Sequence, residues 1–186
     1  MVRESFRVAE GSVVNGPTHK LGAAAAAVLV AGYVGASGVQ AGVVAASAVA
    51  GCLLPDADGH YKRGAGAAGG RSATHSVALG VVGGAALLTM VPYEALAGDL
   101  APAARLLALG FVVGWLSHLV LDALTLERVP LLWPGVGPQV GIGLTSVECN
   151  ATPTEWLVRA ALLVTILYVV AVLWLPAGLL AVKGGP

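Results

Sequence analysis

The chain of 186 residues is 57% hydrophobic and 11% charged, and its ten basic and ten acidic side chains give a formal net charge of zero. A soluble domain usually carries about 25% charged residues, so the composition excludes an ordinary soluble protein and predicts one compact membrane domain. The balanced charge gives no overall electrostatic field that would recruit nucleic acid, and we expect no nucleic-acid partner. Twenty-six glycines are typical of helices that pack closely in lipid.

The first half of the chain opens with a polar N-terminal segment, residues 1–18. Residues 19–186 are predicted to form a single transmembrane helical domain. A first apolar run covers about residues 21–39, and a second covers about residues 41–54. The first run could mimic a secretory signal, because a basic start precedes an alanine-rich stretch. We favour a retained span, since the run is long enough to cross a bilayer.

The rest of the chain alternates polar loops with apolar runs. Residues 55–74 form a glycine-rich loop, residues 92–102 a second loop, and residues 127–154 a third loop rich in proline and glycine. The apolar runs predict spans over about 76–91, 103–126 and 155–182, the last with Thr154 as its N-cap. The sequence therefore predicts an all-α, membrane-embedded bundle of about five transmembrane helices.

Histidines and carboxylates gather at the ends of these runs. His118 and Asp122 stand four residues apart, so on a helix they share one face with Cβ atoms about 5–6 Å apart. An isolated pair of this kind is usually a helix end that meets interfacial water. Here, five spans place four more such residues at the same side of the membrane, which predicts one shared metal pocket. These residues are His19, Asp56, Asp58 and His75.

The basic residues predict the orientation of this pocket. Of the ten lysines and arginines, Arg105 and Lys183 fall on the opposite side, and the others fall on the pocket side. By the positive-inside rule the pocket and the N-terminus are cytoplasmic, and the C-terminus is outside. We therefore expect an integral, multi-pass protein of the cell (inner) membrane.

The expected chemistry follows from these ligand types. Imidazoles and carboxylates suit zinc first, with manganese or iron as alternatives, and they suffice for one or two divalent ions. A metal with an open position lowers the pKa of a bound water to about 7, which favours hydrolysis. We expect Asp58 to act in catalysis as well as ligation. Arg71 would bind a phosphate oxygen, although an anchor to lipid head groups explains it equally well.

Other polar and aromatic residues have structural explanations. His60 lies in a glycine-rich run, where a solvated side chain is expected, although ligation stays open. Glu155 in a first helical turn is favoured by the helix dipole whatever its function. Trp115 and Trp133 are predicted to be interface-belt or packing aromatics. The two cysteines lack CxxC spacing and are predicted to be small apolar packing residues.

Four segments carry a family resemblance: Thr18-His19, residues 54–58 (LPDAD), residues 71–76 (RSATHS) and residues 114–125 (GWLSHLVLDALT). They resemble the YdjM-like group of inner-membrane-associated metal-dependent hydrolases, also described as LexA-binding. The resemblance covers about residues 19–155. That group is remotely similar to the α-helical zinc phospholipase C and P1 nuclease enzymes, whose zinc clusters hydrolyse phosphoesters. The resemblance implies metal ligands at His19, Asp56 or Asp58, His75, His118 and Asp122.

One departure affects His60. The family usually reads PDxDH, whereas Gly59 intervenes before His60 in this chain. The further histidines and the N-terminal residue of the three-zinc site in the soluble enzymes have no counterpart here, so one or two metals are expected.

We consider three functions for this sequence. The leading hypothesis is a membrane-bound hydrolase that cleaves a lipid or lipid-linked phosphoester. The alternative is a non-catalytic membrane anchor that binds a regulatory protein, with a structural metal in a closed ligand sphere. A metal-ion transporter is a third class, but it needs ionisable residues near the middle of the membrane or on both sides. The one-sided placement argues against transport.

Overall fold

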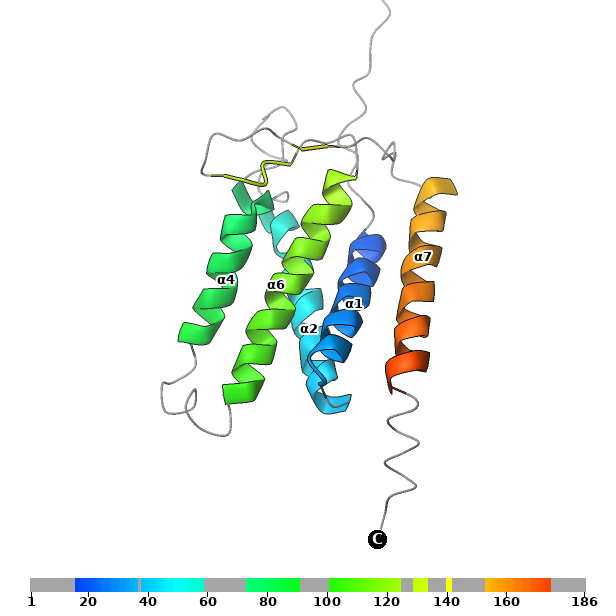
Figure 1. Ribbon diagram of the computed structural model, residues 1–186. Helices are drawn as coiled ribbons and strands as arrows, with labels where there is room; N and C mark the ends of the chain where they lie inside the picture. The colour runs from blue at the N-terminus through cyan, green and yellow to red at the C-terminus, as the bar shows by residue number, and fades with distance from the viewer. Residues whose placement is uncertain are drawn as a thin grey trace, which may run out of the picture.

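A computed structural model of the chain shows a bundle of helices (Figure 1). It describes residues 16–36, 38–58, 73–90, 101–124, 129–133, 140–141 and 153–174. The all-α prediction is confirmed, since five α-helices make up most of this part of the chain. They are α1 (Gly16–Tyr33), α2 (Gly38–Leu53), α4 (Val77–Thr89), α6 (Ala101–Ala123) and α7 (Pro153–Val169).

Short turns extend these helices. The 3-10 turn η1 (Pro55–Asp58) follows α2, and the 3-10 turn η2 (Ala73–His75) precedes α4. A π-helical turn, η3 (Val170–Trp174), continues α7. Within the described residues, the extended backbone pairs at one isolated antiparallel bridge, between Val129 and Val140.

Two stretches in the described part of the chain are long and apolar enough to cross a membrane, Gly38–Ala57 and Pro102–Ala123. Shorter apolar helices cover Val77–Thr89 and Trp156–Val172. Membrane-spanning character by length and composition therefore belongs to α2 and α6. The prediction of five spans goes beyond this finding.

The first helix begins and ends earlier than the apolar run that predicted it. Gly35 has a positive φ of 66°. The amide of Gly35 donates to the carbonyl of Gly32 at 3.2 Å, and the amide of Ala36 donates to that of Ala31 at 2.9 Å. These two hydrogen bonds form a Schellman motif, which ends a helix at a glycine in the left-handed region. The run of apolar residues continues past this point, but the helix does not.

The helix α6 lies at the centre of the bundle, where it packs against α1, α2 and α4 (Figure 1). The seam between α6 and α2 is built on glycine. A Cβ at Gly110 or Gly114 would collide with the carbonyl oxygen of Val44 or Ala48, respectively. Glycine at these positions therefore lets the two backbones touch, as is typical of helices that pack in lipid.

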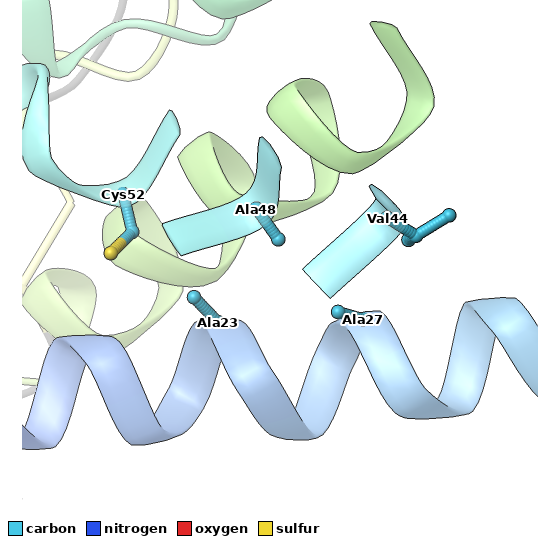
Figure 2. Packing of buried hydrophobic residues seen from close by; sticks show 5 residues of the cluster. All are labelled: Ala23, Ala27, Val44, Ala48 and Cys52. Carbon is cyan, nitrogen blue, oxygen red and sulfur yellow. The ribbon is translucent and has the colours of Figure 1, made fainter. Parts of the chain in front are cut away.

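Small residues also join α1 to α2. Ala23 and Ala27 of α1 face Val44, Ala48 and Cys52 of α2, and all five side chains are almost fully buried (Figure 2). Cys52 has a free thiol and packs in this cluster. Its role as a small packing residue agrees with the prediction.

The helix ends that carry the candidate ligands lie at the same end of the bundle. The first turns of α1, α4 and α7 and the last turns of α2 and α6 all lie at the upper end in Figure 1. The helices α4 and α7 lie on opposite flanks of the bundle, and α7 packs against α1.

Candidate metal centre

Five of the predicted ligands meet at this end of the bundle, from four different parts of the chain. His19 lies in the first turn of α1, Asp56 in η1 after α2, and His75 at the end of η2 before α4. His118 and Asp122 lie in the last turns of α6. The three imidazoles and the Asp122 carboxylate are all buried, with residue exposures between 0% and 4%.

The Asp122 carboxylate is the centre of this group. Its Oδ1 lies 3.3 Å from His19 Nε2, and its Oδ2 lies 3.4 Å from His75 Nε2 and 3.1 Å from His118 Nε2. Asp56 Oδ1 lies 3.4 Å from His75 Nε2 and 3.6 Å from His118 Nε2. The Nε2 atoms of all three imidazoles therefore face carboxylate oxygens.

The orientation of His118 is fixed by the backbone of α2. Its Nδ1 lies 2.7 Å from the carbonyl oxygen of Cys52. A carbonyl oxygen can only accept, so the hydrogen bond requires a proton on Nδ1. In the neutral ring, Nε2 then presents a lone pair to the two carboxylates. A metal-binding histidine commonly donates its other N–H to a carbonyl in this way.

The orientation of His75 is fixed by the residue before it. The Thr74 hydroxyl donates to the Pro55 carbonyl at 2.9 Å, so its oxygen accepts from His75 Nδ1 at 3.2 Å. The proton again lies on Nδ1, and the Nε2 lone pair of a neutral ring points at the carboxylates. Thr74 thus ties the start of η1 to the ligand at the end of η2.

Three further hydrogen bonds hold the turn that carries His75. The Ser76 side chain caps α4 by accepting from the Leu79 amide at 3.3 Å. The Trp115 indole of α6 donates to the Ser76 carbonyl at 2.9 Å. The Val77 amide donates to the Leu131 carbonyl at 3.0 Å. Trp115 is therefore a packing aromatic with a specific hydrogen bond, one of the two roles predicted for it.

The donor set fits a metal ion. Nitrogen lone pairs and carboxylate oxygens about 3 Å apart repel unless a cation or a proton lies between them. The His19 and His118 rings are stacked, with centroids 3.9 Å apart and an interplanar angle of 15°. Two imidazolium cations this close would repel, so the stack disfavours a positive charge on both rings at once, and the neutral imidazole is the form that binds metals. Neutral imidazoles and carboxylates are ligands that zinc prefers.

Two ligand groups share His118. One contains His19, His118 and Asp122, and the other contains Asp56, His75 and His118. Within each group the donor atoms lie within 4.8 Å of one another. These groups could hold a metal ion, and Asp122, with one oxygen toward His19 and the other toward His75 and His118, lies between them.

Several predicted site residues are not placed by the structure. Asp58 ends η1, two residues after Asp56, but its side chain lies outside the described part. His60 and Arg71 also lie outside the described residues, as does the side chain of Glu155 in α7. Their functional roles stay predictions.

The sequence reasoning missed the groups that orient the ligands. These are the Cys52 carbonyl, the Thr74 hydroxyl and the Trp115 indole. One signal was present, because the dipeptide Thr-His occurs at Thr18-His19 and again at Thr74-His75. A hydroxyl directly before a buried histidine is able to bond its ring or a neighbouring backbone group.

The comparison with known families decides the affiliation of the chain. The family model described as the YdjM inner membrane protein matches residues 14–180. The chain belongs to the YdjM inner membrane protein family. No curated protein and no solved structure shows a significant match. The expected remote similarity to zinc phospholipase C and P1 nuclease therefore stays a prediction.

Proposed function

We propose that this YdjM-family chain is a membrane-bound, metal-dependent hydrolase that cleaves a phosphoester. The observation that carries the proposal is the arrangement of the three histidines: each aims Nε2 at a carboxylate, and the Nδ1 atoms of His75 and His118 are engaged by protein groups. This is the arrangement that a metal needs from neutral imidazoles. Zinc is the proposed ion, in one or two copies.

Access to the site favours catalysis over a closed structural metal. The Asp56 side chain is 42% exposed, whereas the Asp122 side chain is fully buried. The ligand set therefore includes one half-exposed carboxylate and one that is sealed inside the bundle. A structural zinc site is normally closed by four protein ligands, whereas a catalytic site keeps an open position.

Under this proposal, each residue has a role in metal binding or catalysis. A bound metal supplies a Lewis acid and an acidified water. His19, His75, His118 and Asp122 hold it, and Asp56 completes the ligand set at the solvent-facing edge. Asp58 and Arg71 keep their predicted roles as a catalytic carboxylate and a phosphate-binding cation.

We further propose that the five helices all span the inner membrane, with the metal centre at the cytoplasmic face. The excess of basic residues on that side supports this orientation. A lipid or lipid-linked phosphoester would then reach the exposed edge of the cluster from the head-group layer. A soluble phosphoester is the alternative substrate, and turnover measured with both kinds of substrate distinguishes the two.

The test is to purify the protein from membranes, measure bound metal by elemental analysis and assay hydrolysis of a phosphomonoester and a phosphodiester. Asp122→Asn keeps the size of the side chain but removes its charge. We expect this variant to lose metal and turnover together. Ser117→Ala is the control, because Ser117 precedes the ligand His118 but its hydroxyl bonds the Gly114 carbonyl of its own helix. Unchanged metal content in Asp122→Asn would refute the proposal.

A further inference from the structure

The helix α7 brings a cation to the metal-centre end of the bundle. The Arg159 guanidinium donates from Nε to the Thr18 hydroxyl at 2.8 Å. Thr18 is 2% exposed and directly precedes the candidate ligand His19. Consecutive Cα atoms are about 3.8 Å apart, so a permanent positive charge is fixed to the residue beside the cluster.

The packing of α1, α6 and α7 one turn further along shows where the Arg159–Thr18 contact lies along the bundle. Gly22 lies one turn after Thr18, and a Cβ there would come within 2.6 Å of Leu121 Cδ1 in α6 and 3.9 Å of Leu162 Cδ1 in α7. Leu121 precedes Asp122 in α6, and Leu162 follows Arg159 by one turn of α7. The helix α7 begins at the metal-centre end of the bundle (Figure 1), so Arg159 lies about one turn nearer to that end than Leu162.

The surroundings of Arg159 hold its guanidinium at the boundary between interior and exterior. The carbon of the guanidinium lies 5.2 Å from the centroid of the Trp156 ring, within the range of a cation–π contact. Trp156 is 59% exposed. The charge thus lies between a buried hydroxyl and an exposed indole, and Arg159 itself is half-buried.

From this geometry we infer that Arg159 is a binding residue for a phosphate oxygen of the ligand that enters the metal centre. The inference rests on the proposed function, which it deepens by assigning recognition of the phosphate to α7. A guanidinium presents N–H donors in a planar fork that matches phosphate oxygens, and its Nε–H donates to Thr18. Thr18 fixes the direction of the fork. The ligand chemistry is a phosphate group, either of a lipid head group or of a soluble molecule.

The experiment measures binding of inorganic phosphate to the purified, metal-containing full-length protein by equilibrium dialysis. Arg159→Gln is expected to weaken phosphate binding by about tenfold or more, because a charge-assisted hydrogen bond is lost. Arg159→Lys keeps the charge without the fork and is expected to weaken binding to an intermediate extent. Arg105→Gln is the control, since Arg105 is an exposed arginine in the second turn of α6, at the far end of the bundle.

Metal content and thermal midpoint are measured on the same samples to separate recognition from structure. The inference predicts that Arg159→Gln retains the metal and the midpoint of the wild type. Loss of metal or of folding in both Arg159 variants would show a structural role and overturn the inference. Equal phosphate affinity in wild type and Arg159→Gln, or no saturable binding by the wild type, would overturn it as well.

Failure of this inference is distinguishable from failure of the proposed function. A wild-type protein that holds metal and hydrolyses phosphoesters, but is indifferent to Arg159→Gln, refutes the assignment of Arg159 alone. A wild-type protein without metal or turnover refutes the function itself. Competition against phosphate by nanodiscs of phosphatidic acid, compared with phosphatidylcholine, then identifies whether the phosphate comes from a lipid head group or from a soluble molecule.

Discussion

Gly114 of α6 and Ala48 of α2 touch through their backbones, because a Cβ at Gly114 would overlap the Ala48 carbonyl oxygen. The two helices that meet here are the candidate spans Gly38–Ala57 and Pro102–Ala123, and they also carry Asp56, His118 and Asp122. The distance between these helices therefore sets the distance between ligands.

Gly114→Ala should push α6 from α2. Overpacking of this kind costs about 1–3 kcal/mol, so we expect a lower thermal midpoint in detergent and a weaker affinity for metal. Gly42→Ala is the control, because a Cβ at that helical position would meet no atom within 4 Å beyond the backbone of its own helix. Alanine there is expected to be neutral or to stabilise the helix by up to about 1 kcal/mol. Equal midpoints for the two variants would contradict the backbone contact.

Thr74→Val should reduce metal affinity without removing a ligand. The hydroxyl accepts from His75 and donates to Pro55, and valine does neither while keeping the branched shape. Loss of a group that orients a metal ligand typically costs about 10–100-fold in affinity. Titration of metal-depleted protein with zinc measures this change. Thr74→Ser retains the hydroxyl and should bind within a few-fold of wild type, so equal affinities for Val and Ser would exclude the orienting role.

Trp115→Phe should loosen the turn that carries His75. The substitution keeps an aromatic ring against Gly80 and Phe111 but removes the indole donor to the Ser76 carbonyl. The Ser76 carbonyl keeps only the longer hydrogen bond from the Gly80 amide, at 3.4 Å, and the loss of one hydrogen bond costs about 0.5–1.5 kcal/mol. We expect a lower thermal midpoint, measured beside Trp133→Phe, where the side chain is 44% exposed and little change is expected. A Trp115→Phe protein as stable as the Trp133→Phe protein would count against this hydrogen bond.

Removal of the metal should destabilise the folded bundle. An ion that binds the folded state raises stability with its concentration, by about 2.7 kcal/mol at one hundred times the dissociation constant. A chelator should therefore lower the thermal midpoint of the wild type, and added zinc should restore it. The Asp122→Asn protein should show neither shift. A midpoint that chelator and zinc leave unmoved would argue that the cluster holds no ion.

The proposed topology predicts which residues react from outside the cell. Tyr33, the last residue of α1, is 92% exposed. Leu132, which follows the C-terminal end of α6, is 64% exposed. After both native cysteines are replaced by alanine, Tyr33→Cys should react with a membrane-impermeant maleimide on spheroplasts. Leu132→Cys should react only after the cells are opened. The reverse pattern would invert the proposed orientation.

The helices could be predicted because long apolar runs are a local property of the chain. The predicted spans over about 76–91 and 103–126 correspond to α4 (Val77–Thr89) and α6 (Ala101–Ala123). The end of α1 could not be read in this way. The residues around Gly35 remain apolar, and the helix stops because the glycine adopts a positive φ.

The meeting of ligands was predicted from the order of the spans, which is a coarse topological argument. The orienting groups required the structure. His118 bonds a carbonyl 66 residues away, and Trp115 bonds one 39 residues away. Backbone carbonyls have no signature in the sequence, because every residue carries one. In the sequence, Arg159 is one of ten basic residues. Its contact with Thr18 depends on how α7 packs against α1.

The order in which the ligands occur along the chain has a consequence for biogenesis. His19, Asp56 and His75 leave the ribosome before α6 exists, and Asp122 is the centre to which the imidazoles point. Until that residue has been synthesised, the earlier donors have nothing to converge on. Under the proposed function, a metal would therefore be loaded only after α6 has been inserted, and a nascent chain truncated before α6 should carry no metal.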